Sequence, residues 1–136
     1  MELYTPKIIP KTWGYEEVIA HEDVNGVEMY CGKKLHLNKG FRCSLHSHSK
    51  DETFYIESGR ILFEMEDDDA WIEGRIMILT DIVRILPFRK HRFSGIDSSI
   101  IIEFSTTDCE SERFSLSEAI PDFENWRRDI LDKYGR

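Results

Sequence analysis

The chain has 136 residues and a mass of 16.1 kDa, a length that suits a single domain spanning residues 1–136. Its 18 lysines and arginines stand against 26 aspartates and glutamates, which gives a formal net charge of −8. This sign repels nucleic-acid phosphates and anionic lipids at long range, so we expect neither nucleic acid nor a membrane as a partner. Hydrophobic residues make up 40% of the chain, which supplies a core without a disulfide or a structural metal, so any bound metal is expected to be functional.

The three cysteines indicate a reducing compartment. Cys31, Cys43 and Cys109 are scattered and form no Cys-x-x-Cys pair, so the sequence supports neither a disulfide scaffold nor a zinc ribbon. The first residues lack the basic start and apolar stretch of a signal peptide, and no apolar run approaches the ~18 residues of a membrane span. We therefore expect a cytoplasmic protein.

The middle of the chain consists of short runs rich in β-branched, aromatic and alternating residues. These runs cover residues 27–37, 42–46, 53–57, 60–65, 75–80, 82–86 and 98–105. Turn residues such as Asn38-Lys39-Gly40 and Ser58-Gly59 separate them. Many short strands close together predict an all-β sandwich or barrel.

The end of the chain has a different pattern. Phe123, Trp126, Ile130 and Leu131 follow helical spacing, acidic residues stand at the start of this segment and basic residues at its finish. The pattern predicts an amphipathic α-helix over about residues 122–134. We expect its apolar stripe to pack on the parent sheet rather than on a partner.

Four residues have the chemistry of a metal site. His46 and His48 are two apart, so on an extended chain both imidazoles point to the same face. Glu52 stands at the entrance of the next apolar run, where a turn folds its carboxylate back toward them. His91 follows later, at the start of another β-type run. Three imidazoles and a carboxylate suit one divalent ion such as Zn, Mn, Fe or Ni, with positions left open for water or substrate.

The spacing of these residues resembles a known family motif. It runs Gly40, five residues, His46-x-His48, three residues, Glu52, six residues and Gly59, and it is similar to the first motif of the cupins at every defining position. The resemblance covers about residues 27–105 and implies the cupin double-stranded β-helix, a jelly-roll barrel, followed here by the C-terminal α-helix. His91 matches the histidine of the second cupin motif, within residues 79–93.

The second motif departs from the family pattern at its turns. Thr80, Leu86 and Phe88 stand where the pattern has glycine, proline and glycine. The family pattern therefore does not predict the conformation of the turn before His91.

Within the cupins, three short segments of the sequence are most similar to the sugar isomerase branch. Residues 33–37, 44–48 and 102–106 resemble mannose-6-phosphate isomerase-like and D-lyxose isomerase-like proteins. The mannose-6-phosphate isomerase type has glutamine where His46 stands and one more residue before its glutamate. The resemblance implies a small-molecule substrate, a sugar or sugar phosphate, and a role in carbohydrate metabolism.

Four further residues are candidates for substrate chemistry. Arg42 and Ser44 share the parity of the two histidines and are candidate substrate contacts; Arg42 would bind a phosphate or carboxylate, or pair with Glu52 or Glu103. Lys50 lies between two ligands and would act on a sugar hydroxyl, or be solvated. Glu103 stands among apolar neighbours, which favours a raised pKa and base chemistry if it faces inward.

Three functions fit these residues. The first is a metal-dependent sugar or sugar-phosphate isomerase or epimerase, with Glu103 or Glu52 as the base. The second is an iron-dependent dioxygenase with the same ligands, and the third is a non-catalytic metal- or sugar-binding cupin. Metal identity, oxygen uptake and turnover of aldoses separate them. Because a cupin sheet leaves an edge and an apolar outer face, and because Trp71 and Trp126 occur in so short a chain, we also expect a homodimer.

Overall fold

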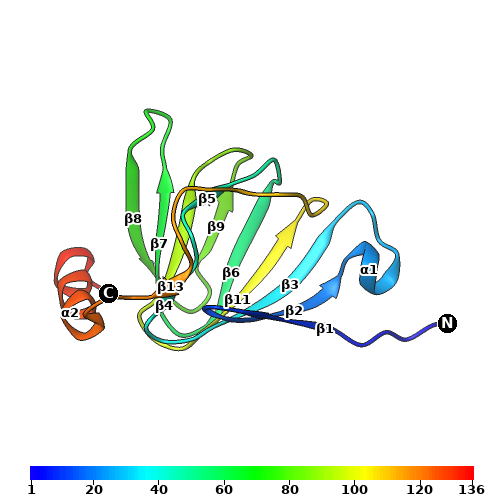
Figure 1. The fold of residues 1–136 in the computed structure, drawn as a ribbon, viewed down its shortest axis with the longest axis horizontal. Helices are drawn as coiled ribbons and strands as arrows, with labels where there is room; N and C mark the ends of the chain where they lie inside the picture. Colours follow the sequence, from blue (N-terminus) through cyan, green and yellow to red (C-terminus); the bar gives the residue numbers. More distant parts are fainter.

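Two antiparallel β-sheets form the body of the computed structural model, which describes residues 1–136 (Figure 1). The first sheet has the order β1 (Lys7–Lys11), β2 (Gly14–Ala20), β3 (Cys31–Leu37), β11 (Ser99–Ser105), β6 (Glu52–Ser58) and β9 (Ile82–Ile85). The second has the order β12 (Glu112–Arg113), β5 (His46–Ser47), β10 (His91–Gly95), β4 (Phe41–Arg42) and β13 (Glu118–Ala119). On its other side β10 pairs with β7 (Ile61–Glu66), which pairs with β8 (Ile72–Met77).

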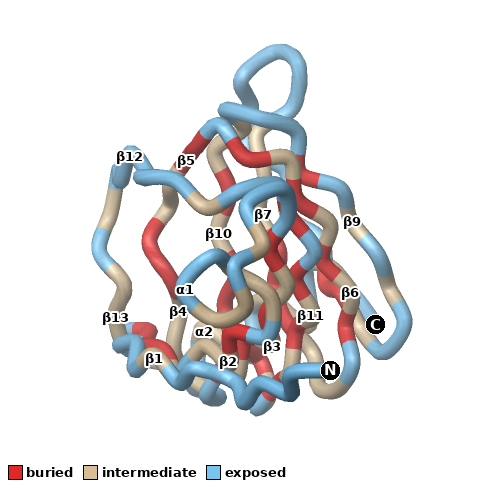
Figure 2. The backbone as a smooth tube through the Cα atoms, turned by 90° about the vertical axis from the view of Figure 1, so that its right-hand side faces the viewer, coloured by how far each residue is buried: buried red, intermediate tan, exposed pale blue.

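Alternation along the central strands divides the interior into an apolar part and a polar part. On β3, Leu35 and Leu37 belong to the main core cluster, whereas the inward residue at the other end of the strand is Lys33. On β11, Ile101 is in the core and Glu103, two residues further, is buried in the polar part. Figure 2 shows buried segments concentrated in these strands. One end of the barrel therefore encloses charged groups.

The C-terminal helix predicted from the sequence is confirmed as α2 (Phe123–Tyr134). It lies beside β8 at one end of the molecule (Figure 1). Its apolar face covers a small second cluster, which consists of Leu62, Ile76 and Ile96 with Ile78, Trp126, Ile130, Leu131 and Tyr134 packed against it. Neither α2 nor the short α1 (Glu22–Asn25) is long and apolar enough to cross a membrane. All three cysteines are free.

The predicted all-β architecture is correct, but the strand boundaries differ in places. The run at 42–46 divides into β4 and β5, separated by three residues outside any strand, and the run at 27–37 begins as a strand only at Cys31. The strands β1, β2, β12 and β13 were not expected. Strand β1 contains Pro10 and is exposed on both faces except at Ile9, so it lacks the alternation that marks a half-buried strand.

The turns of the second cupin-like motif keep a glycine-type conformation without glycine. Thr80 has φ 70° and Phe88 has φ 67°, both in the left-handed region. This conformation costs roughly 1–2 kcal/mol for a residue with a side chain. The Phe88 N–H donates to the His48 carbonyl at 2.7 Å, and the Thr80 N–H donates to the Ile56 carbonyl at 2.9 Å. The first of these bonds ties the turn before His91 to the loop that carries His48.

Candidate metal centre

Strand pairing brings together the three histidines singled out in the sequence. His46 begins β5, His48 follows that strand, and His91 begins β10. In the antiparallel pairing of β10 with β5, His91 lies directly opposite His46. One ring nitrogen of each of the three histidines lies within 4.8 Å of the others. Two motifs far apart in the chain therefore meet at one point.

Backbone carbonyls fix the orientation of two of the imidazoles. Nδ1 of His46 lies 2.7 Å from the Ser44 carbonyl oxygen, and Nδ1 of His91 lies 2.8 Å from the Arg89 carbonyl oxygen. Because a carbonyl only accepts, each Nδ1 is the donor, and Nε2 of the neutral ring has a free lone pair. Burial, with repulsion from His91, lowers the pKa of His46 to about 4, so this ring is neutral at pH 7.

Glu52 completes the set at the start of β6. Its Oε2 lies 3.2 Å from Nε2 of His48 and 3.3 Å from Nε2 of His91. This oxygen, Nε2 of His91 and Nδ1 of His48 are buried and have no hydrogen-bond partner. Burial by itself raises the pKa of Glu52, but His48, His91 and the Lys50 charge hold it well below its usual range. With Nδ1 of His91 turned to the Arg89 carbonyl, Nε2 of the neutral ring and Oε2 of Glu52 are two acceptors 3.3 Å apart, an arrangement that a bound cation would satisfy.

The donor set indicates which cations fit. Imidazole nitrogens and a carboxylate suit borderline divalent ions of the first transition series. His46, His48, His91 and Glu52 would hold the ion. An ion that prefers more than four ligands would have a coordination position left for water or substrate beside these four protein donors.

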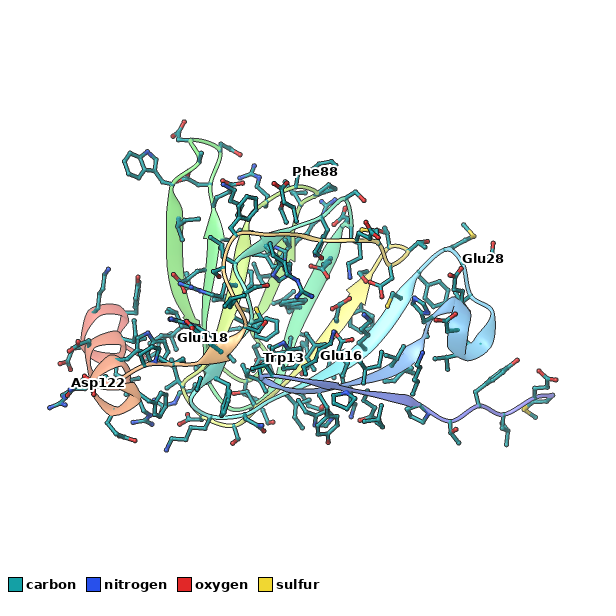
Figure 3. The ribbon with its side chains drawn as sticks, in the orientation of Figure 1. Trp13, Glu16, Glu28, Phe88, Glu118 and Asp122 are labelled. Carbon is teal, nitrogen blue, oxygen red and sulfur yellow. The ribbon has the colours of Figure 1, made fainter.

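Three of the four candidate ligands line a cavity of about 910 Å³, whereas His91 is buried behind it. His46, His48 and Glu52 line it, and so do apolar residues such as Trp13. Glu16 lines it from β2, and Figure 3 labels both Trp13 and Glu16 at the base of the barrel. The cavity is large enough for a small molecule.

A network of buried charges adjoins the ligands. Nζ of Lys50 lies 3.2 Å from Oε1 of Glu52, 3.3 Å from Oε2 of Glu103 and 2.8 Å from Oδ1 of Asp108. Nζ of Lys33 lies 3.0 Å from Oδ2 of Asp108. Both ammonium groups are buried, as are Glu52 and Glu103. The sequence left the face of Glu103 open, and the structure turns it inward.

The charge states follow from this arrangement. Burial by itself lowers the pKa of Lys50, but Glu103, Glu52 and Asp108 hold it above its usual range. Burial and the Glu52 charge raise the pKa of Glu103, and Lys50 offsets this only in part because three carboxylates share it. Despite its burial, bonds from Lys50 and Lys33 lower the pKa of Asp108 to about 2. Glu103 is thus the acid of the network that is easiest to protonate.

The structure separates the two candidate substrate contacts. Ser44 is buried and lines the cavity. Arg42 does not line it; its Nε and Nη2 donate to Oε1 of Glu118 at 3.1 and 2.5 Å, and neither Glu52 nor Glu103 is its partner. Glu118 is labelled in Figure 3 on β13. The expectation that Arg42 shares a face with His46 is wrong because residues 43–45 are not in a strand. The alternation of side chains therefore does not continue from β4 into β5.

Sequence reasoning missed three members of the network. Lys33 had a usable signal, because it alternates with Leu35 and Leu37 on one face of a strand. Asp108 lies outside any strand, and His21, whose Nε2 is 3.5 Å from Oδ2 of Asp108, caps the short α1. No local pattern marks either of them.

Comparison with known proteins gives the fold a name. No protein-family model matches the chain, and no curated protein matches it in sequence. Solved structures do match in three dimensions. The oxalate decarboxylase of Lactobacillus farciminis in complex with formate superposes with a TM-score of 0.69 and 14% identity, over 80% of this chain and 34% of that one.

Two further structures are similar. CapF with the inhibitor 3-isopropenyl-tropolone has a TM-score of 0.67 and 14% identity, over 84% of this chain and 35% of that one. KdgF from Halomonas sp. has a TM-score of 0.59 and 16% identity, over 71% and 80% of the two chains. This chain thus spans about a third of the oxalate decarboxylase and of CapF. All three have the cupin fold, and the chain has the same fold.

Proposed function

We propose that this protein is a metal-dependent isomerase or epimerase of a small sugar or sugar phosphate. The observation that carries the proposal is the position of Glu103, a buried carboxylate with a raised pKa that lines the same cavity as the metal ligands. A buried carboxyl group with a raised pKa beside a metal site is suited to general acid–base work. The cytoplasmic location and the homodimer expected from the sequence belong to the proposal.

The ligands would hold a divalent ion, which polarises a carbonyl group and the neighbouring hydroxyl of a bound sugar. His46 and His91 are already oriented for this by the Ser44 and Arg89 carbonyls. Their positions are therefore preorganised, and binding needs little rearrangement.

Glu103 would be the base. Its Oε2 accepts from Ser105 Oγ at 2.8 Å and from Lys50 at 3.3 Å, while Oε1 makes no hydrogen bond. In isomerisation, Oε1 would take the proton from C2 and deliver it to C1, while the hydroxyl proton of O2 moves to O1 through solvent, so that an enediol lies between aldose and ketose. In epimerisation, C2 would instead receive a proton from solvent on its opposite face. Lys50 stays protonated, so in this proposal it orients Glu103 and Glu52 and donates to a substrate hydroxyl. Ser44 would contact the substrate from the cavity wall.

The test is isomerisation in deuterium oxide. Protein loaded with Zn²⁺, Mn²⁺, Fe²⁺ or Ni²⁺ is incubated with aldoses and aldose phosphates. NMR follows the isomer formed and deuterium incorporation, at C1 of a ketose product or at C2 of an epimeric aldose. We expect both signals for at least one substrate. Glu103→Gln should abolish both, because an amide cannot accept the proton.

Glu57→Gln is the matched control, since Glu57 is an exposed glutamate whose partner is Lys34. It should retain full activity. Absence of both signals with every substrate and metal would refute the proposal, and oxygen uptake by the Fe²⁺ form would favour the dioxygenase instead.

A further inference from the structure

We propose that Arg113 binds an anionic group, a carboxylate or a phosphate, of the small molecule that occupies the metal cavity. This inference rests on the proposed function only in assuming that the ligand sits at the metal site. Arg113 lies in residues 106–117, here called the strap, which cross one end of the barrel between β11 and β13 (Figure 1).

Strand pairing places Arg113 next to one of the candidate metal ligands. In the antiparallel pairing of β12 with β5, Arg113 lies opposite His46 and Glu112 lies opposite Ser47. Figure 2 shows β12 beside β5 at the exposed edge of the molecule. Residues opposite each other on antiparallel strands have their Cβ atoms on one face, about 5 Å apart. Arg113 therefore shares the face of a metal ligand, and it lines the cavity.

Hydrogen bonds fix the strap against the ligand loop. The Phe114 N–H donates to the Leu45 carbonyl at 2.8 Å, and the Leu45 N–H donates to Ser115 Oγ at 2.8 Å. The Ser44 N–H donates to Ser117 Oγ at 3.0 Å. The backbone at Arg113 is thereby held in register with His46 while its side chain stays exposed.

Arg113 differs from the other cationic residues of the cavity in having no partner. Lys33 and Lys50 are each held by carboxylates, and Lys7 and Lys11 lie 3.9 Å from Asp23 and Glu16 respectively. Arg113 has no carboxylate within 4.0 Å and makes no side-chain hydrogen bond. Its guanidinium is free to take a ligand.

The charge around the cavity favours an anion once a metal is bound. Six carboxylates and five cationic side chains line it, so a divalent ion turns the balance positive. A guanidinium recognises carboxylate and phosphate in a bidentate manner. A ligand that binds the metal through its oxygens would thus place an anionic end against Arg113.

The experiment measures affinity for matched ligands in the metal-loaded protein. Glucose, glucuronate and glucose 6-phosphate share one skeleton and differ only in the group at C6; the mannose and galactose series extend the set. Calorimetry should show, in at least one series, tighter binding of an anionic member than of the neutral sugar. Arg113→Gln should reduce this preference by about tenfold to a hundredfold, while Arg113→Lys should retain part of it. Comparison of the two anionic members distinguishes carboxylate from phosphate.

Arg128→Gln is the matched control, because Arg128 is exposed on α2 and does not line the cavity. Metal content should be unchanged in all variants. The inference is overturned if no anionic member is preferred in any series, or if the preference survives in Arg113→Gln. It is independent of turnover: an Arg113-dependent preference without isomerisation would refute the proposed function alone, and isomerisation without the preference would refute this inference alone.

Discussion

Nζ of Lys50 lies 3.3 Å from Oε2 of Glu103, and both side chains are buried beside the candidate metal ligands. Removing the ammonium group would leave the carboxylates of Glu103 and Glu52 buried with less compensation. We expect Lys50→Met to lower the free energy of unfolding of the metal-free protein by about 3–5 kcal/mol. The loss should shrink at acidic pH, where the carboxylates protonate.

Urea unfolding at pH 7 and pH 5 measures this effect. Lys34→Met is the control, because Lys34 pairs with Glu57 at 3.4 Å on the outer side of the sheet, where both are partly exposed. It should change stability by less than about 1 kcal/mol. Equal losses in the two variants would contradict the assigned role of Lys50.

A second prediction concerns the pH dependence set by Glu103. Ser105 Oγ donates to its Oε2 and favours the ionised form, so Ser105→Ala should raise the pKa of Glu103 further. A catalytic base must be ionised, and the acid limb of activity should therefore move to higher pH. A pH profile of kcat/KM checks this, and an unchanged limb would argue against Glu103 as the base.

The same shift has a signature in stability. Because the folded pKa of Glu103 lies above its ordinary value of 4.5, its protonation favours the folded state at low pH. This contribution is lost as the pH rises through the folded pKa. Ser105→Ala should therefore cost more stability at pH 7 than at pH 4, and Glu103→Gln should remove this part of the pH dependence.

A third prediction concerns removal of the metal. The main core contains twelve buried residues, none of which is a candidate ligand, and the ligands are divided among β5, the loop after it, β6 and β10. Chelation should leave the circular dichroism spectrum unchanged and reduce stability only by the binding linkage, RT ln(1 + [L]/Kd). Cooperative unfolding on chelation would instead show that the ion is needed for folding. It would favour a non-catalytic site, in which the protein fills every coordination position, over an enzyme.

A fourth prediction isolates one ligand. His48→Ala should remove most of the metal affinity and all isomerase activity, because it takes away one of three clustered imidazoles. Metal analysis after dialysis measures this. His36→Ala is the control, since His36 stacks on Tyr15 and contacts Glu17 on the outer face, and its metal content should equal that of the unmodified protein. Full metal content in His48→Ala would refute the assigned site.

A fifth prediction concerns the two left-handed turns. Thr80→Gly and Phe88→Gly should each stabilise the protein by about 1 kcal/mol, because both residues are exposed and have positive φ. Thermal unfolding measures the gain. Gly59→Ala should do the opposite, because its φ is 81° and a Cβ there would lie 2.2 Å from Ser99 Oγ. Destabilisation by both glycine variants would contradict these turn conformations.

Features that depend on neighbours along the chain could be predicted from the amino-acid sequence. Residues two apart on a strand share a face, so the alternation at Lys33, Leu35 and Leu37 and the His46-x-His48 pair are local facts. The helical stripe around Trp126 is local in the same way and predicted α2 within one residue at its start. The cupin-like spacing added His91 and the barrel that carries it.

The surroundings of the candidate metal ligands follow from the three-dimensional pairing of the strands. The inward face of Glu103 follows from the pairing of β11 between β3 and β6, while Arg42 turns to Glu118 because the strand breaks at residue 43. Asp108 and Arg113 reach the cavity through a strap that pairs with β5, more than sixty residues earlier in the chain. Such contacts depend on long-range strand register, which no local periodicity encodes, and this is why the sequence pointed to the candidate ligands, Lys50 and Glu103 but did not place Asp108 or Arg113 at the cavity.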